Sequence, residues 1–429
     1  MPLNPCELEI DLFCRGIRIP DDVALDGARG ISRTRAGLGS GLEVVIPGGS
    51  WLKDAIWANV PVEERFARES PYVLAGSPAA GYHVVDERTQ ARYSIQIPAE
   101  PAWYSQNTAR GIPMNRIGVL QGTYLGIYVN MVCTFWNYSP ALNCRFCTTG
   151  NNVGEHEVVD KAIEDVVETA RAAKAQSGVT FVHLNAGFQG NRGVQFAEPY
   201  IKALKEQVGV LVGAQLAPQK DFSHYDRLLD LGVDHLSFCP EFVDHEWFAK
   251  LCPGKERVLG QQIFFDSIEY CAKKMPKGAV SGEIIAGVEP LEATHRGIDW
   301  IADHGAFPTV CIFRPTVGSD MEDYPSPKYD DMREVMTHVY EACRRNWIPI
   351  GAAPNIEVSI VVNPDDAALL APRGPGFYAF EAYRRAIRAL ARPLFSRRMR
   401  PRLRRDFGGN GEIPPAATPS ATGDTSVKA

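Results

Sequence analysis

Short apolar runs alternate with longer amphipathic stretches through the middle of the chain. The runs predict six strands, over Leu125–Val132, Val179–Leu184, Val208–Gln215, Asp234–Phe238, Ala279–Ala286 and Thr309–Phe313. Apolar residues at helical spacing predict the intervening helices, over Asp160–Gln176, Phe196–Glu206, His224–Asp230, Gln262–Met275, Leu291–His304 and Tyr329–Arg345. A helix after each strand makes the sheet parallel. We therefore expect an α/β fold, a full or partial (β/α) barrel of the TIM type, although an open doubly wound sheet has the same pattern.

Two different patterns flank this predicted barrel core, which spans residues 117–372. Residues 1–116 contain short β-type runs, such as Leu42–Ile46 and Tyr93–Ile97, separated by turns rich in Gly and Pro, and predict a strand-rich N-terminal module. Residues 373–429 predict a basic, helical C-terminal extension, with a helix from Phe377 to Leu390 that Pro393 ends. Beyond Phe407 the Pro, Ala, Thr and Ser composition predicts disorder.

Composition and charge narrow the class of protein. The chain has 429 residues, of which 45% are hydrophobic and 22% charged, as is typical of a globular protein. We expect no membrane span, since no apolar run approaches ~18 residues, and a cytoplasmic location, since the first residues are acidic. Ten arginines and no acid lie between Arg384 and Arg405. This segment can contact an anionic partner, although docking on the acidic body is the simpler expectation.

Three cysteines follow the first predicted barrel strand within fifteen residues. Cys133, Cys144 and Cys147 are spaced C-x10-C-x2-C, in a loop at the carboxyl end of the sheet, where active sites of such folds lie. A structural zinc site uses four ligands, whereas an iron–sulfur cluster held by three thiolates keeps one iron open. The sequence therefore favours a cluster over buried structural cysteines or a zinc site completed by a residue such as His156.

This segment resembles the radical S-adenosylmethionine (SAM) superfamily, whose common pattern is C-x3-C-x-Φ-C. Phe146 stands at the aromatic position before the last cysteine, and the first gap is ten residues instead of three. The phrase Leu251-Cys252-Pro253-Gly254-Lys255 looks like one from the biotin-synthase-like branch. The resemblance implies a 4Fe-4S cluster held by the three cysteines.

The resemblance also implies residues that contact SAM. The turn after the second strand keeps small residues but lacks the family's acid, which leaves Asn185, Gly187 and backbone carbonyls for the SAM amine. On the fourth strand Glu241, with Ser237 second, is expected to bind the ribose hydroxyls.

Two further contacts to SAM follow from the same resemblance. Lys255 or Arg257 is expected to pair with the SAM carboxylate, and the strand around Ala286 to form an apolar wall near the adenine. Arg314, at the end of the sixth strand, can bind an anionic substrate or neutralise Glu289 or Asp320.

The activity implied is reductive cleavage of SAM, giving a 5'-deoxyadenosyl radical that abstracts hydrogen from an unidentified small-molecule substrate. A flavodoxin- or ferredoxin-type protein would donate the electron. No catalytic side chain is assigned. The alternatives are a zinc-dependent barrel hydrolase and a non-catalytic metal-binding scaffold.

Overall fold

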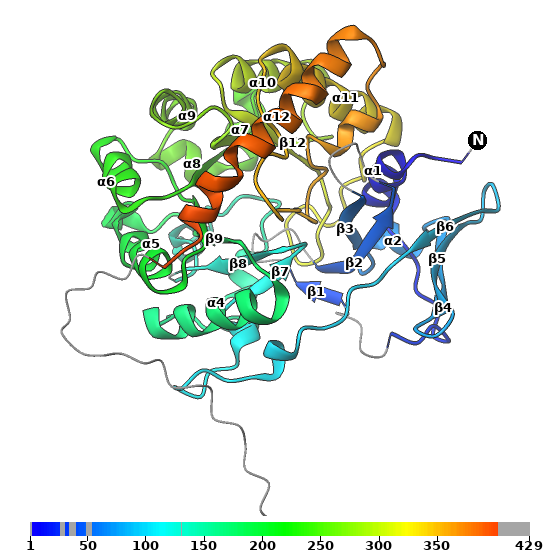
Figure 1. Ribbon diagram of the computed structural model, residues 1–429, viewed down its shortest axis with the longest axis horizontal. Coiled ribbons are helices and arrows are strands. Elements are labelled where there is room, and N and C mark those ends of the chain that lie inside the picture. Colours follow the sequence, from blue (N-terminus) through cyan, green and yellow to red (C-terminus); the bar gives the residue numbers. More distant parts are fainter. Residues whose placement is uncertain (1, 26–30, 34–39, 49–53, 130, 402–429) are drawn as a thin grey trace, which may run out of the picture.

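A seven-stranded sheet forms the centre of the molecule in a computed structural model that describes residues 2–25, 31–33, 40–48, 54–129 and 131–401 (Figure 1). Its order is β13-β12-β11-β10-β9-β8-β7. The strands are β7 (Val119–Gln121), β8 (Tyr124–Tyr128), β9 (Phe181–Asn185), β10 (Leu211–Gln215), β11 (His235–Glu241), β12 (Val280–Ala286) and β13 (Phe307–Ile312). Strands β8 to β13 are parallel and β7 is antiparallel. The sheet curls into a half-barrel, so the partial barrel is confirmed.

Helices alternate with the parallel strands, as the apolar periodicity predicted. They are α4 (Ile163–Ser177), α5 (Glu198–Ala203), α6 (Ser223–Leu231), α9 (Gln262–Lys274), α10 (Leu291–Asp303) and α11 (Tyr329–Arg345), with the shorter α3 (Thr149–Asn152), α7 (His245–Leu251) and α8 (Pro253–Val258) near the strand ends. Helix α4 has acids in its first turn and ends at Gly178 in the left-handed conformation, which satisfies its terminal carbonyls. The core lies between these helices and the sheet.

The N-terminal region contains two three-stranded antiparallel sheets, as expected for a strand-rich segment. Their strands are β1 (Ile31–Arg33), β2 (Ser40–Pro47) and β3 (Ala55–Pro61), then β4 (Tyr72–Ser77), β5 (Gly81–Asp86) and β6 (Ala91–Ile95), with the short α2 (Arg65–Arg68) between the sheets. An unexpected helix, α1 (Pro5–Arg15), precedes them. Asn4 and Glu7 form its capping box, a local signal that the strand-rich interpretation passed over.

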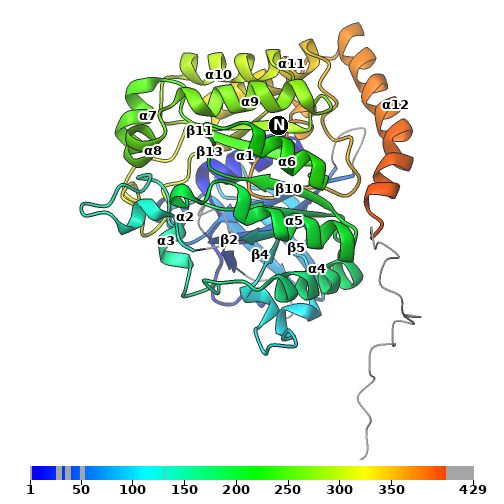
Figure 2. The ribbon, with the colours of Figure 1, turned by 90° about the vertical axis from the view of Figure 1, so that its left-hand side faces the viewer.

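The C-terminal helix α12 (Pro375–Arg398) runs down one side of the molecule (Figure 2). The prediction that Pro393 ends this helix is wrong. Proline removes the bond to the carbonyl of Ala389, but Ala389 is exposed, so water can take that place. Residues 402–429, including the segment expected to be disordered, lie outside the described residues. Within the described part, every helix is too short or too polar to cross a bilayer.

Candidate functional site

The first cysteine, Cys133, lies five residues past the end of β8, and the segment after it folds back on itself. Cys133 caps a short 3-10 helix (Thr134–Asn137), its carbonyl accepting from the amide of Trp136 at 3.0 Å. Leu142 N–H donates to the Phe135 carbonyl at 3.0 Å, and Cys147 N–H to that of Cys144 at 3.0 Å. The ten residues between the first two cysteines therefore form a closed loop, and all three cysteines are free thiols.

Apolar contacts fix this loop on its neighbours. The buried ring of Phe135 stacks on Phe188 with centroids 4.7 Å apart. Gly254 N–H donates to the Leu142 carbonyl at 3.0 Å, and a side chain at Gly254 would come within 2.5 Å of Phe135. The longer first gap is thus accommodated by packing between the turn after β9 and the α7–α8 junction.

The turn after β9 approaches the first cysteine closely. A Cβ atom at Gly187 would lie 2.5 Å from the Cβ and 3.0 Å from the Sγ of Cys133. Thr134 N–H donates to the Phe188 carbonyl at 2.8 Å, and Gly187 N–H donates to the Tyr128 hydroxyl at 3.0 Å. Only glycine permits this approach. Asn185, at the end of β9, is buried, and its Oδ1 has no hydrogen-bond partner in the described structure.

The three thiols interact electrostatically within a buried environment. Burial raises the pKa of Cys133 to about 12 and that of Cys147 to about 11, and each thiolate is opposed by the charge of Cys144. A thiolate is the ligand form, so bound iron would reverse these shifts. Among the described residues no three Cys, His, Asp or Glu side chains converge on one ion.

A fourth cysteine, which sequence reasoning missed, lies beside the group. Cys252 hydrogen-bonds to Cys144 and lowers the pKa of that thiol, while burial raises the pKa of Cys252 itself. In the sequence, the segment around Cys252 was considered for its family resemblance and its cations, and not for its thiol. Its contact with Cys144 depends on tertiary structure, because more than a hundred residues separate the two.

Glu241 and Lys255, each predicted to contact SAM, are paired with one another. Lys255 Nζ lies 2.6 Å from Glu241 Oε1 and also donates to the Cys239 carbonyl at 2.8 Å. Glu241 has a φ of 65° at a bulge between β11 and β12, which directs the chain out of the strand. Arg257, the alternative cation, is exposed. The structure thus brings Glu241 and Lys255 together but leaves Arg257 outside this pair.

A polar network continues from this ion pair into the barrel. Gln215 Nε2 donates to Cys239 Sγ at 2.7 Å and also to Glu283, which accepts from Ser237 as well. Burial raises the pKa of Glu283 to about 7, and the charge of Glu241 acts in the same direction. Glu283 was quoted in the sequence only as part of a strand motif, so its role in this network was not predicted.

The remaining predicted residues occupy apolar surroundings or contact other elements. Phe146 packs edge-on against Phe242 with centroids 5.8 Å apart, and Ala286 is buried in the core. Arg314 fits neither expectation: its guanidinium reaches the N-terminal region, where it donates to the Asn59 carbonyl and lies 3.8 Å from Glu64.

Both acids suggested for Arg314 have other partners. Asp320 pairs with Arg145 at 3.0 Å, and Glu289 accepts the amides of Val243 and Asp244. The fold thus uses Arg314 to attach the N-terminal region, a role that needed the tertiary structure to be seen.

No family model matches the sequence. One curated protein, bacteriochlorophyllide c C-7(1)-hydroxylase of Chlorobaculum limnaeum, is 24% identical over 284 residues, covering 60% of this chain and 67% of that protein.

Solved structures with similarity include SuiB of Streptococcus suis, with 16% identity, 52% of this chain and 48% of that chain covered, and a TM-score of 0.39. This chain therefore spans about half of SuiB. A radical SAM methyltransferase from Sphaerobacter thermophilus has 11% identity, 65% and 76% coverage, and a TM-score of 0.39.

The chain is built on a partial (β/α) barrel, with a cysteine loop at the carboxyl end of its first parallel strand. Its cysteine loop resembles that of the radical SAM superfamily, and the curated protein to which it is similar is an enzyme. SAM and an iron–sulfur cluster are the cofactors that this resemblance implies.

Proposed function

We propose that this chain cleaves SAM reductively at a 4Fe-4S cluster held by Cys133, Cys144 and Cys147. When bound, the cluster supplies one electron to SAM, whose carbon–sulfur bond breaks to give methionine and a 5'-deoxyadenosyl radical that takes hydrogen from a substrate. The observation that carries the proposal is the half-buried group of three mutually interacting thiols. Gly187 lies so close to Cys133 that only a glycine fits there.

The chain's own residues position the cofactors. The loop contacts of Phe135 hold Cys133 in place, and the Cys252 thiol donates to Cys144 and stabilises its thiolate. Asn185 offers an unpaired amide oxygen to the SAM amine, and the backbone at Gly187 leaves room for the ligand. These residues orient SAM and exclude water; they transfer no proton.

The ion pair of Glu241 and Lys255 has two ways to contact SAM. The Glu241 carboxylate can accept hydrogen bonds from the ribose hydroxyls while it stays paired with Lys255. Alternatively, the Lys255 ammonium can face the SAM carboxylate. We favour the first, because Lys255 is already shared between Glu241 and the Cys239 carbonyl. Ser237 is engaged by Glu283 and Ser281 and serves better as support for that network than as a ribose ligand.

The test is 5'-deoxyadenosine release by anaerobically reconstituted full-length chain given SAM and dithionite. We expect release in the wild type and about a hundredfold less or none in the C133A/C144A/C147A variant. Gly187→Val should lower iron per chain at least twofold, since its side chain would overlap Cys133, whereas Gly374→Ala, which meets no neighbouring atom, should bind iron normally. A cluster-loaded wild type that releases no more 5'-deoxyadenosine than the triple variant would overturn the proposal.

The substrate assay follows from the same setup. The curated relative is named for hydroxylation of bacteriochlorophyllide c, so that compound, whose carboxylate would have to stay outside the apolar cavity described below, is the first candidate to add. A flavodoxin- or ferredoxin-type protein is the proposed physiological donor of the electron, in place of dithionite.

A further inference from the structure

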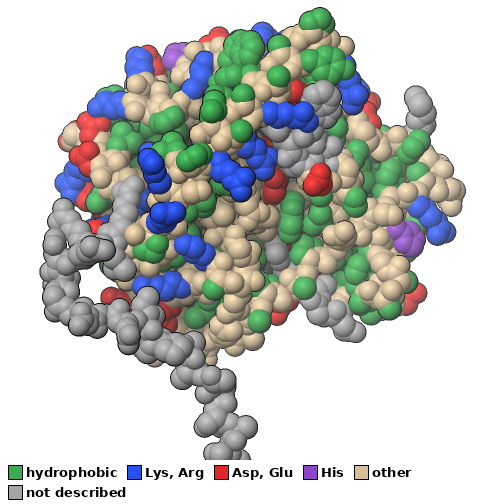
Figure 3. All heavy atoms as spheres, viewed as in Figure 1, with side chains coloured by type: hydrophobic (Ala, Val, Ile, Leu, Met, Phe, Trp, Pro, Cys, Tyr) green, Lys and Arg blue, Asp and Glu red, His purple; other side chains and the backbone are tan. Residues whose placement is uncertain are grey.

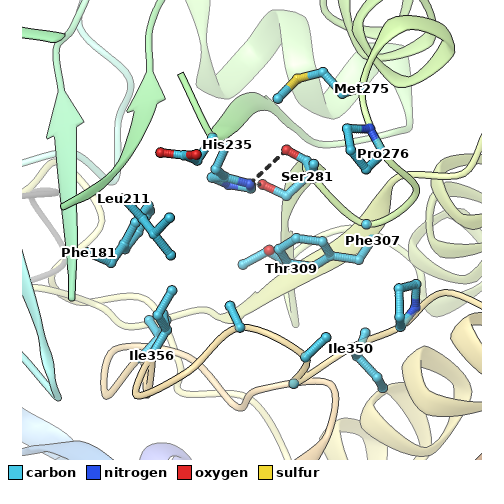
Figure 4. Close-up of a pocket in the computed structure, with 18 of the residues that line it drawn as sticks. Phe181, Leu211, His235, Met275, Pro276, Ser281, Phe307, Thr309, Ile350 and Ile356 are labelled. Carbon is cyan, nitrogen blue, oxygen red and sulfur yellow. Dashed lines mark hydrogen bonds between the residues drawn. The ribbon is translucent and has the colours of Figure 1, made fainter. Parts of the chain in front are cut away.

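A cavity of about 610 Å³ occupies the interior of the half-barrel (Figure 4). One wall is the concave face of the sheet, including Phe181, Leu211 and Phe307, the first residues of their strands. The opposite wall comes from the segment after α11, including Ile350 and Ile356, and from α12. The cavity therefore extends along the strands to their amino ends, away from the cysteine loop.

Most of the lining residues labelled in Figure 4 are apolar, and the two imidazoles that line the cavity, those of His183 and His235, are neutral. Burial lowers the pKa of His183 to about 3 and that of His235 to about 4. His235 is bonded to the Ala279 carbonyl at 3.0 Å and to Ser281 at 3.3 Å, as the dashed line in Figure 4 marks for the latter. These side chains present no charge to a bound molecule.

Most charged residues at the amino-end rim are already paired within the chain. Arg398 of α12 lies 2.6 Å from Asp234, and Lys274 lies 2.6 Å from Asp226. Asp365 lies 3.6 Å from the buried Arg384, whereas Lys277 is exposed and donates to the Asn346 carbonyl. An anion inside the cavity would have to displace one of these partners or stay away from the exposed Lys277 and face the Glu283 carboxyl, and either is costly.

A buried polar atom at the inner part of the cavity wall, Nε2 of His183, has no partner in the described structure, and this residue is nine-tenths buried. Oδ1 of Asn185 is likewise without a partner there, but it is the atom proposed above for the SAM amine. A buried polar group without a hydrogen bond costs about 1–3 kcal/mol, which a ligand carrying one donor or acceptor would recover.

The inner end of the cavity adjoins the proposed cofactor site. Gln215 and Glu283 line it and are bonded to Cys239, whose carbonyl binds Lys255. Asn185 is two residues from Gly187, which contacts Cys133. A molecule filling the cavity would therefore direct one end toward the cysteine loop.

We propose that this cavity binds the substrate, and that the part of the substrate that enters it is mainly apolar and not anionic, with a hydrogen-bonding group near His183. That the bound molecule is the substrate rests on the proposed function. The chemical class of that molecule follows from the cavity alone. The α12 residues that line it, among them Ala391, place its outer wall at that helix.

The test uses N-phenyl-1-naphthylamine, a neutral aromatic probe with one N–H donor that fluoresces in apolar sites, against its sulfonated analogue 1-anilinonaphthalene-8-sulfonate. We expect the full-length chain to bind the neutral probe at least about tenfold more tightly, because the sulfonate would enter unpaired. Ala391→Trp should weaken binding of the neutral probe at least about tenfold by filling the cavity. Ala389→Trp, on the exposed side of the same helix, should change it less than about twofold.

The C133A/C144A/C147A variant separates this proposal from the proposed function. Probe binding should persist in it, so a chain that binds the probe but releases no 5'-deoxyadenosine would contradict only the proposed function. The cavity proposal would be overturned if the folded wild type bound neither probe or bound both equally well. Equal effects of Ala391→Trp and Ala389→Trp on probe binding would also overturn it.

Discussion

Glu283 shows how one buried carboxyl makes stability depend on pH. Burial raises its pKa from 4.5 to about 7, so the folded chain holds a proton there that the unfolded chain releases. Its contribution is therefore present at low pH and lost as pH rises from about 4.5 through 7. Replacing it by Gln, which keeps the hydrogen-bonding geometry, should stabilise the chain relative to wild type increasingly over that window, by up to about 3 kcal/mol at pH 8.

Urea unfolding of wild type and Glu283→Gln from pH 5 to pH 8 measures this difference. Because Glu289 is shifted in the same direction, only the difference between the two proteins isolates Glu283. Glu292→Gln, at an exposed position, should follow the wild-type profile. Parallel profiles for wild type and Glu283→Gln would show that the carboxyl does not titrate in this window.

Single residues also show where sequence reasoning ended. The three cysteines could be proposed as ligands because their spacing and their place after a strand are both local. The contact of Cys252 with Cys144 and the pairing of Glu241 with Lys255 were not predicted. Each depends on which of many polar or thiol side chains the tertiary structure brings together. Residue type indicated which chemistry was available, and only packing determined which groups meet.

Among the elements, the loop between Cys133 and Cys144 depends on one aromatic anchor. Phe135 is 2% exposed and stacks on Phe188. Phe135→Ala should cost about 3–5 kcal/mol and loosen Cys133, so iron bound per chain after reconstitution should fall at least twofold. Tyr138→Ala, in the same loop but 41% exposed, should keep both properties.

Iron and sulfide content, with urea unfolding of the same samples, checks this expectation. Phe135→Leu serves if the alanine variant does not fold, with an intermediate loss expected. Full iron content in a destabilised Phe135 variant would mean that the loop does not position the cysteine.

The same scale explains which elements were predictable. Strands β9 and β12 and helices α10 and α11 carry strong periodic patterns, and the predicted bounds agree within two residues. The short strand β7 has no such pattern and exists because it pairs with β8. Helix α12 continues past Pro393 because its exposed side tolerates the missing hydrogen bond. The exposure of that side depends on tertiary structure and could not be predicted from the local sequence.

At the scale of the whole molecule, the N-terminal region and the half-barrel are joined through buried polar contacts. Gly122 N–H, at the turn between β7 and β8, donates to Glu43 at 2.6 Å, and Asn59 N–H donates to the Ser359 carbonyl at 2.6 Å. Lys and Arg side chains gather along α12 on the face shown in Figure 3. Two arginines of this helix, the buried Arg384 and the partly exposed Arg398, pair with Asp365 and Asp234 of the barrel half. The expectation that the basic segment docks on the acidic body thus holds for these arginines.

The ion pair of Arg314 with Glu64 is a buried contact within this attachment. Burial already raises the pKa of Glu64, and Arg314 opposes that shift. Arg314→Met would leave a buried carboxyl that must either stay charged or take a proton, at a cost of about 3–5 kcal/mol near neutral pH. Since the proton is bound more readily in the folded variant, its loss of stability should be smaller at pH 5 than at pH 8.

Arg65→Met is the matched control, because Arg65 faces Asp323 at 3.6 Å with both side chains more than 80% exposed, and it should change stability by less than about 0.5 kcal/mol. Unfolding followed both by tryptophan fluorescence and by circular dichroism measures the effect and tests whether the two regions unfold together. If Arg314→Met were as stable as Arg65→Met at pH 8, the pair would not secure the N-terminal region.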